Sequence, residues 1–147
     1  MVFDPIKNEM FYAEKGRGAY LNNSRIRVSS RNNIKDSIAL TGCPILDANN
    51  FEIFLKEHKS IMKNFNKVRN LGSAALDLSY VAAGRAEVFW HKNLKYWDLA
   101  AGILIVKEAG GTITDYKGNT FQKNNSELLA TNSRIDLETT RILSSIK

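Results

Sequence analysis

The sequence predicts a layered fold of the α/β or α+β class, because short strand-like runs alternate with helix-like runs along the chain. In residues 1–30 the strand-like runs are separated only by turn residues, which is the pattern of a β-meander. From residue 37 onward, apolar runs typical of strands alternate with segments whose apolar residues recur at helical spacing. With 147 residues, the chain is long enough for one domain with a hydrophobic core.

The N-terminal meander is defined by its turns. Gly-Arg-Gly at 16–18 and Asn-Asn-Ser at 22–24 favour tight turns, and Asp-Pro at 4–5 precedes another turn. The strands expected between them cover 9–13, 19–21 and a third segment that includes Ile26 and Val28.

The rest of the chain alternates between the two kinds of element. Glycines mark the expected helix ends, as at Gly84 and at Gly110-Gly111. The expected strands cover 37–41, 67–71, 87–90, 112–115 and 127–130, and the expected helices cover 49–65, 74–83, 97–109 and 135–146.

The helix expected at 49–65 is amphipathic. Its lysines, which continue to Lys67, are most simply a solvated face. Its apolar stripe is expected to face the core, with His58 as a core or rim histidine, and it consists of Phe51, Phe54, Leu55, His58, Met62 and Phe65.

Composition narrows the function classes. The net charge of +6 favours some attraction to anions, but the basic residues are scattered, so nucleic-acid binding is only weakly indicated. The single cysteine, Cys43, excludes an internal disulfide, fits a reducing cytoplasm and is expected to pack as a small apolar residue. No apolar run is long enough to span a membrane, and charges near the N-terminus argue against a signal peptide. We therefore expect a cytoplasmic protein with no membrane partner.

The segment from Trp97 to Gly111 is the most informative stretch. It places one carboxylate, Asp98, at the start of a helix that is otherwise almost wholly apolar, so the helix is predicted to be buried. An acidic residue there can act as an N-terminal cap that meets the positive end of the helix dipole. It can also bind a metal, because a charge at the edge of a buried element needs a partner.

Three segments in order along the chain, Phe3–Asn22, Arg69–Leu78 and Trp97–Gly111, resemble the inositol monophosphatase family of Mg-dependent, lithium-sensitive sugar phosphatases. The bacterial, suppressor-type branch is the most similar. The resemblance implies an α+β fold, specifically the layered α/β sandwich of the sugar-phosphatase type. It also implies phosphate release from inositol monophosphate or a related sugar phosphate, with Mg²⁺ as cofactor.

The resemblance also implies roles for individual residues. Asp98 matches the aspartate that completes one Mg²⁺ site and faces the scissile phosphate. Gly72, Ser73 and Ala74 match the substrate-binding turn, whose backbone and side chain contact substrate hydroxyls. Ser73 can equally be a plain helix N-cap, because serine is among the best capping residues.

One position departs from the family pattern. Seven residues before the signature aspartate, family members commonly carry a glutamate that accepts hydrogen bonds from sugar hydroxyls, and this sequence has His91 there. A neutral histidine can accept one hydrogen bond but cannot act as a two-oxygen acceptor. The resemblance therefore places His91 in the substrate site while weakening the expectation of an inositol preference.

A larger departure is an absence. The family supplies most metal-binding carboxylates from an N-terminal Gly-Glu-Glu segment and an Asp-Pro-x-Asp-Gly-Thr loop, and neither occurs here. We therefore expect residues 1–147 to be a C-terminal inositol-monophosphatase-like domain without the metal-binding half. Asp98 alone cannot hold a reactive cluster. The other acids on neighbouring elements, Asp77, Glu87 and Glu108, are expected to be helix-face or strand-end charges.

Two functions remain open from the sequence. The chain is expected to be a truncated phosphomonoester hydrolase of the inositol-1-monophosphatase type that is inactive alone. It would act on a phosphorylated polyol or sugar and would pair with the missing N-terminal half or with a second copy. The alternative is a non-catalytic module that binds protein or RNA in transcription and RNA processing. Half of a layered fold should expose strand edges and apolar faces, so self-association is expected.

Overall fold

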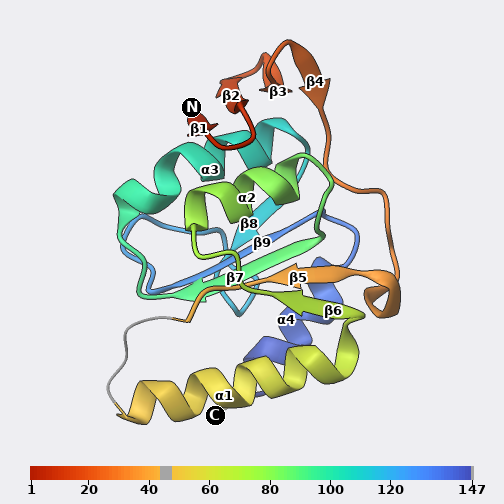
Figure 1. Cartoon of the computed structure of the whole chain (residues 1–147). Helices are drawn as coiled ribbons and strands as arrows, with labels where there is room; N and C mark the ends of the chain where they lie inside the picture. Colours follow the sequence, from red (N-terminus) through yellow and green to blue (C-terminus); the bar gives the residue numbers. More distant parts are fainter. Residues whose placement is uncertain (44–47, 147) are drawn as a thin grey trace.

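The structure is a computed structural model that describes residues 1–43 and 48–146. Its elements form stacked layers (Figure 1). A small antiparallel sheet lies over two helices, α2 and α3, and these lie on one face of a larger mixed sheet whose other face is covered by α1 and α4. The predicted layered α+β arrangement is therefore confirmed.

The small sheet is the predicted meander. Its strand order follows the sequence, and all of its pairs are antiparallel. The first strand was not among those expected, and Val28 lies outside the last strand. The strands are β1 (Val2–Asp4), β2 (Glu9–Glu14), β3 (Gly18–Leu21) and β4 (Ser24–Ile26).

The larger sheet is mixed, with the order β6-β5-β7-β9-β8. β5 runs parallel to both β6 and β7, whereas β9 runs antiparallel to β7 and β8. The parallel strands therefore end at the same edge of the sheet. The strands are β5 (Ile38–Leu40), β6 (Lys67–Arg69), β7 (Val88–Lys92), β8 (Thr112–Thr114) and β9 (Glu127–Thr131).

The predicted helices are present, together with a short 3₁₀ turn at Ile34–Asp36. α2 and α3 pack so closely that a Cβ atom built on Gly102 would lie 2.5 Å from Leu78 Cδ1. Glycine at this crossing therefore lets the two helices approach each other between the sheets. The helices are α1 (Ala48–Asn64), α2 (Ala74–Ala82), α3 (Tyr96–Glu108) and α4 (Asp136–Ser144). Within the described part of the chain, no helix is long and apolar enough to cross a membrane.

The buried face of α1 differs from the predicted stripe. Ile61 and Phe65 are buried, but Leu55 and Met62 are 43% and 59% exposed. Glu57 is instead buried against the larger sheet, where its carboxylate lies 2.5 Å from Lys92 Nζ. This ion pair sets the rotation of the helix and turns part of the apolar stripe toward solvent. The lysine-rich face is solvated as expected.

The prediction of a wholly buried α3 is wrong at its start. Trp97 is 78% exposed, and Asp98 is exposed as well, whereas Leu99, Gly102, Ile105 and Val106 are buried. The first turn of α3 therefore carries apolar surface that no other described part of the chain covers. Cys43 is also exposed and does not pack as an apolar residue.

Two acids that were expected to be plain helix-face or strand-end charges join separate segments of the chain. Glu87 is fully buried, accepts a hydrogen bond from the Ile38 N–H at 2.7 Å and pairs with Arg31 at 3.3 Å. Glu108 accepts hydrogen bonds from the N–H groups of Gly16 and Gly18, at 2.8 and 2.9 Å. Glu108 therefore ties α3 to the small sheet, and Glu87 ties β7 to β5.

Candidate functional site

A cleft of about 280 Å³ opens where the parallel strands of the larger sheet end. The segment after β5, the end of β7 and the N-terminus of α2 meet there. The carboxyl ends of parallel strands are the usual location of ligand sites in such sheets. The cleft is lined by Gly42, Cys43, Asn70, Gly72, Ser73, Ala74, Asp77, His91 and Leu94. The structure thus brings together four residues that the sequence had assigned to substrate binding.

Gly72 and Ser73 shape the turn that leads into α2. Gly72 has a φ of +85°, which favours glycine, and a Cβ atom added there would meet nothing within 4 Å. Ser73 is the N-cap of α2, and its Oγ accepts a hydrogen bond from the Leu76 N–H at 3.4 Å. The capping role of Ser73 is therefore confirmed, and the wall of the cleft is a helix N-terminus.

His91 is buried and has a defined tautomer. Its Nδ1 lies 2.7 Å from the Lys92 carbonyl oxygen, which can only accept, so Nδ1 carries the proton. Burial also lowers the pKa of His91, which keeps the ring neutral at pH 7. Nε2 is then left as an acceptor. It lies so close to Gly42 that a Cβ atom there would be 2.8 Å away.

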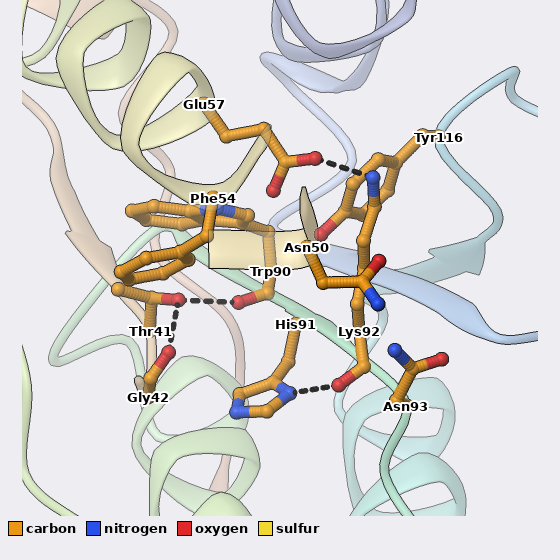
Figure 2. A pocket seen from close by; sticks show the side chains of 10 residues that line it. All are labelled: Thr41, Gly42, Asn50, Phe54, Glu57, Trp90, His91, Lys92, Asn93 and Tyr116. Carbon is orange, nitrogen blue, oxygen red and sulfur yellow. Dashed lines mark hydrogen bonds and ion pairs between the residues drawn. The ribbon is translucent and has the colours of Figure 1, made fainter. Parts of the chain in front are cut away.

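A small cavity of about 10 Å³ is also lined by His91 (Figure 2). Figure 2 shows His91 below this cavity and the Glu57–Lys92 ion pair above it. Lys92 Nζ also lies 3.3 Å from Glu127 and 5.0 Å from the centre of the Tyr116 ring. Burial raises the pKa of Glu57, and Lys92 opposes that rise. These contacts fix the backbone that positions His91.

Asp77 is the cleft residue that the sequence reasoning missed. It is only 1% exposed, and its Oδ1 has no hydrogen-bond partner among the residues that the structure describes. Burial raises its pKa from 3.8 to about 7. It is therefore not a solvated helix-face charge. A lone acid within the apolar run Ala-Ala-Leu-Asp-Leu was the signal that could have found it.

We expect the unfolding free energy to depend on pH through Asp77. Because its folded pKa lies above its unfolded value, stability falls as pH rises from about 4 to 7, by about 1.4 kcal/mol per pH unit. Asp77→Asn removes this dependence. The variant should be more stable than the parent at pH 8, by about 4 kcal/mol, and similar to it at pH 4. Urea unfolding at both pH values measures the gap, and parallel pH profiles would contradict this account.

Asp98 is not among the residues that line the cleft. It is the third residue of α3, whose N-cap is Lys95, so the structure does not support the alternative in which Asp98 caps the helix. Its position in the first turn still meets the positive end of the helix dipole. Across residues 1–43 and 48–146, no group of three His, Cys, Asp or Glu side chains could hold a metal ion. The side chains of the described residues therefore do not fit a complete Mg²⁺ site.

A family comparison agrees with this geometry. The model of the inositol monophosphatase family matches residues 1–147. The chain belongs to the inositol monophosphatase family. Its resemblance to the bacterial, suppressor-type branch is also confirmed, because relatives named inositol-1-monophosphatase and SuhB match it at about 40% identity.

Comparison with individual family members shows how much of their length this chain matches. An inositol-1-monophosphatase from Rhizobium meliloti is 45% identical over 118 residues, which are 80% of this chain and 44% of the relative. The Nus factor SuhB of Pseudomonas aeruginosa is 43% identical over 121 residues, which are 81% of this chain and 45% of the relative. The chain thus spans about half the length of the inositol monophosphatase relatives it matches.

The solved structures of family members agree. The extragenic suppressor protein SuhB from Bartonella henselae matches with a TM-score of 0.91 and 42% identity, covering 96% of this chain and 54% of that protein. The inositol monophosphatase from Anabaena also gives a TM-score of 0.91, at 32% identity, covering 99% of this chain and 57% of that protein. The α+β fold is therefore that of about half an inositol monophosphatase.

Proposed function

We propose that this chain is the C-terminal half of an Mg²⁺-dependent phosphomonoester hydrolase of the inositol-1-monophosphatase type, and that it is inactive alone. The family match over residues 1–147 supports the reaction class. The set of metal ligands supports the proposal that the site is incomplete. Asp98 is one exposed carboxylate, and the described residues contain no cluster that could hold a metal. Mg²⁺ catalysis of phosphate release needs several oxygen ligands.

The proposed roles follow the two parts of the site. Gly72, Ser73 and Ala74, at the N-terminus of α2, would contact the hydroxyl groups of a phosphorylated polyol or sugar, and His91 would accept one hydrogen bond through Nε2. Asp98 would supply one ligand to Mg²⁺. The remaining ligands would come from the N-terminal half, which would also position the phosphate. We also propose a cytoplasmic location, and the single cysteine of the sequence is consistent with it.

The partner of this half would cover its uncovered apolar surface. Phe3 and Met10 lie opposite each other on β1 and β2, and they are 52% and 37% exposed. Phe11, which follows Met10, points the other way and is fully buried against α2 and α3. We define the exposed side of β1 and β2 as the outer sheet face. An exposed apolar face next to an edge strand favours binding of a partner, which would be either the missing half or a second copy of this chain.

Complementation tests the proposed function. The N-terminal segment of the Rhizobium meliloti relative, produced separately, would be mixed with this chain in Mg²⁺ and inositol monophosphate. We expect phosphate release that rises with added segment and saturates at equal molar amounts, with no release from either piece alone. A stable mixed complex without phosphate release would contradict the proposed function, and the absence of any complex would contradict the proposed partner.

We expect the chain to self-associate through the outer sheet face in the absence of that partner. Replacing Phe3 and Met10 together by lysine puts two charges on this face and should reduce association at least several-fold, because like charges in symmetric contacts repel. Sedimentation velocity across a concentration series measures the change. Leu137→Lys, at a 71% exposed position on α4, is the matched control and should have little effect. A parent chain that stays monomeric throughout would contradict this expectation.

A second function is favoured by the names of some relatives and by charge. Several relatives are Nus factors, and this chain carries a net charge of +6. The alternative is a non-catalytic module that binds RNA or the transcription machinery. RNA affinity that falls steeply with salt and is unchanged by Asp98→Asn would favour this alternative over the enzyme half.

A further inference from the structure

The floor of the cleft holds a buried carboxyl group whose location needs an explanation. Asp77 is 1% exposed and lines the cleft beside Ser73 and His91, yet its Oδ1 has no partner among the described residues. Buried polar groups in folded proteins are nearly always hydrogen-bonded, so an orphan of this kind marks a place where a ligand or a water completes the structure. The cleft is the open space that this side chain borders.

We propose that the Asp77 carboxylate is a hydroxyl acceptor of the cleft, which acts together with His91 Nε2 to bind two hydroxyl groups of a polyol. Asp77 Oδ1 has no donor among the described residues, and the neutral His91 ring leaves Nε2 as an acceptor. The Lys92 carbonyl occupies the only donor of the neutral His91 ring. A ligand that satisfies both must therefore donate twice, which a diol does and a carboxylate or phosphate does not.

This arrangement bears on specificity. The family glutamate at the position of His91 would present two oxygens, whereas here one acceptor comes from β7 and the other from α2. A negative charge on Asp77 would also repel the phosphate of a substrate and would favour binding of its uncharged hydroxylated part in this cleft. Sites built to hydrogen-bond a hydroxyl group discriminate strongly against analogues that lack it. Asp77 is therefore assigned as a specificity-determining residue.

The state of Asp77 adds a measurable signature. Burial is the sole resolved cause of its raised pKa of about 7, with no charge on the packed elements α3, β1, β7 or β9 contributing. The other titratable groups that line the cleft are His91 and Cys43. Hydroxyl donation stabilises the ionised carboxylate, so polyol binding should lower the pKa of Asp77. Affinity should then rise between pH 6 and pH 8, by up to about tenfold.

The inference rests on the proposed function, because the polyol would be the non-phosphorylated part of the substrate. Its test needs neither Mg²⁺ nor turnover. The full chain, labelled with ¹³C and ¹⁵N, would be titrated with myo-inositol at pH 6 and pH 8 while the Asp77 carboxyl and the amides of Ser73 and His91 are followed by NMR. We expect shifts at these groups, a lowered Asp77 pKa and tighter binding at pH 8.

Variants and a second probe separate the outcomes. Asp77→Asn should weaken inositol binding about tenfold at pH 8, match the parent at pH 6 and lose the pH dependence. Asp36→Asn changes an exposed carboxylate outside the cleft and should bind like the parent. Cyclohexanol, with one hydroxyl, should bind far more weakly than myo-inositol.

The inference is overturned if inositol leaves the cleft resonances or the Asp77 pKa unchanged, or if Asp77→Asn binds as the parent does at pH 8. Complementation that restores phosphate release while Asp77→Asn has no effect on inositol binding would remove this inference and keep the proposed function. Inositol binding through Asp77 without restored activity would do the reverse.

Discussion

Asp98→Asn should reduce phosphate release by about 10²-fold to 10³-fold in the enzyme assembled from this chain and a separate N-terminal segment. This is the size of effect seen when a group that stabilises transition-state charge is removed. Asparagine keeps the size of the side chain but removes the negative charge that a divalent cation requires. Phosphate release at saturating Mg²⁺ measures the loss, and raising Mg²⁺ should restore part of it if the ligand role is correct.

The same substitution should leave the fold intact. Asp98 is exposed and does not cap α3, so its replacement removes no hydrogen bond that the structure shows. Glu138→Gln, at an exposed position in the first turn of α4, is the matched control and should keep full activity. Equal activity of the Asp98→Asn and Glu138→Gln enzymes would contradict the metal-ligand role.

Glu87→Ala should destabilise the chain by about 1–3 kcal/mol, the range for leaving a buried hydrogen-bond donor without its acceptor. Glu87 is fully buried, and its loss would leave the Ile38 N–H without an acceptor where β5 begins. The pair with Arg31 would also be lost, although half of the Arg31 side chain is in solvent, so this contact is the smaller contribution. Urea unfolding monitored by Trp90, which lies in the core, measures the change.

A more conservative variant separates charge from packing. Glu87→Gln keeps the shape and one acceptor oxygen for the Ile38 N–H, so it should cost less than half as much as the alanine variant. Arg31→Ala should cost about 1 kcal/mol. If Glu87→Ala unfolds at the same urea concentration as the parent, Glu87 does not join β7 to β5.

The fold was largely predictable from sequence because its signals are local. Gly and Asn turns defined the meander, and helical spacing, apolar runs and helix-ending glycines placed α1 to α4 to within a few residues. Strand β1 was not predictable in this way, because its short Val-Phe-Asp run lies against Asp-Pro and gains its order from pairing with β2. Local patterns therefore specify the elements, and their pairing comes from tertiary contacts.

The rotation of α1 could not be predicted, because two different faces of this helix could pack against the core. The one chosen by spacing includes Leu55 and Met62, which are exposed, whereas the buried one includes Ile61 and Glu57. A glutamate becomes the buried choice only because Lys92, on a strand far along the sequence, is placed opposite it. No pattern within the helix contains that information.

The candidate site divides in the same way. The positions of Gly72, Ser73, Ala74 and His91 followed from a family resemblance, and the structure places all of them around one cleft. Asp77 did not follow, because its importance lies in burial without a partner, which depends on how α2 packs between two sheets. Asp98 stood out in the sequence, and its role as a metal ligand stays a prediction, in which the other ligands come from the N-terminal half.

The most direct measurement is phosphate release from inositol monophosphate by the pure chain in Mg²⁺. One exposed carboxylate and no metal-binding cluster among the described residues predict no release above a protein-free blank, at any Mg²⁺ concentration. Mg²⁺-dependent release by the pure chain that disappears in Asp98→Asn would show a complete site within these 147 residues and would contradict the account.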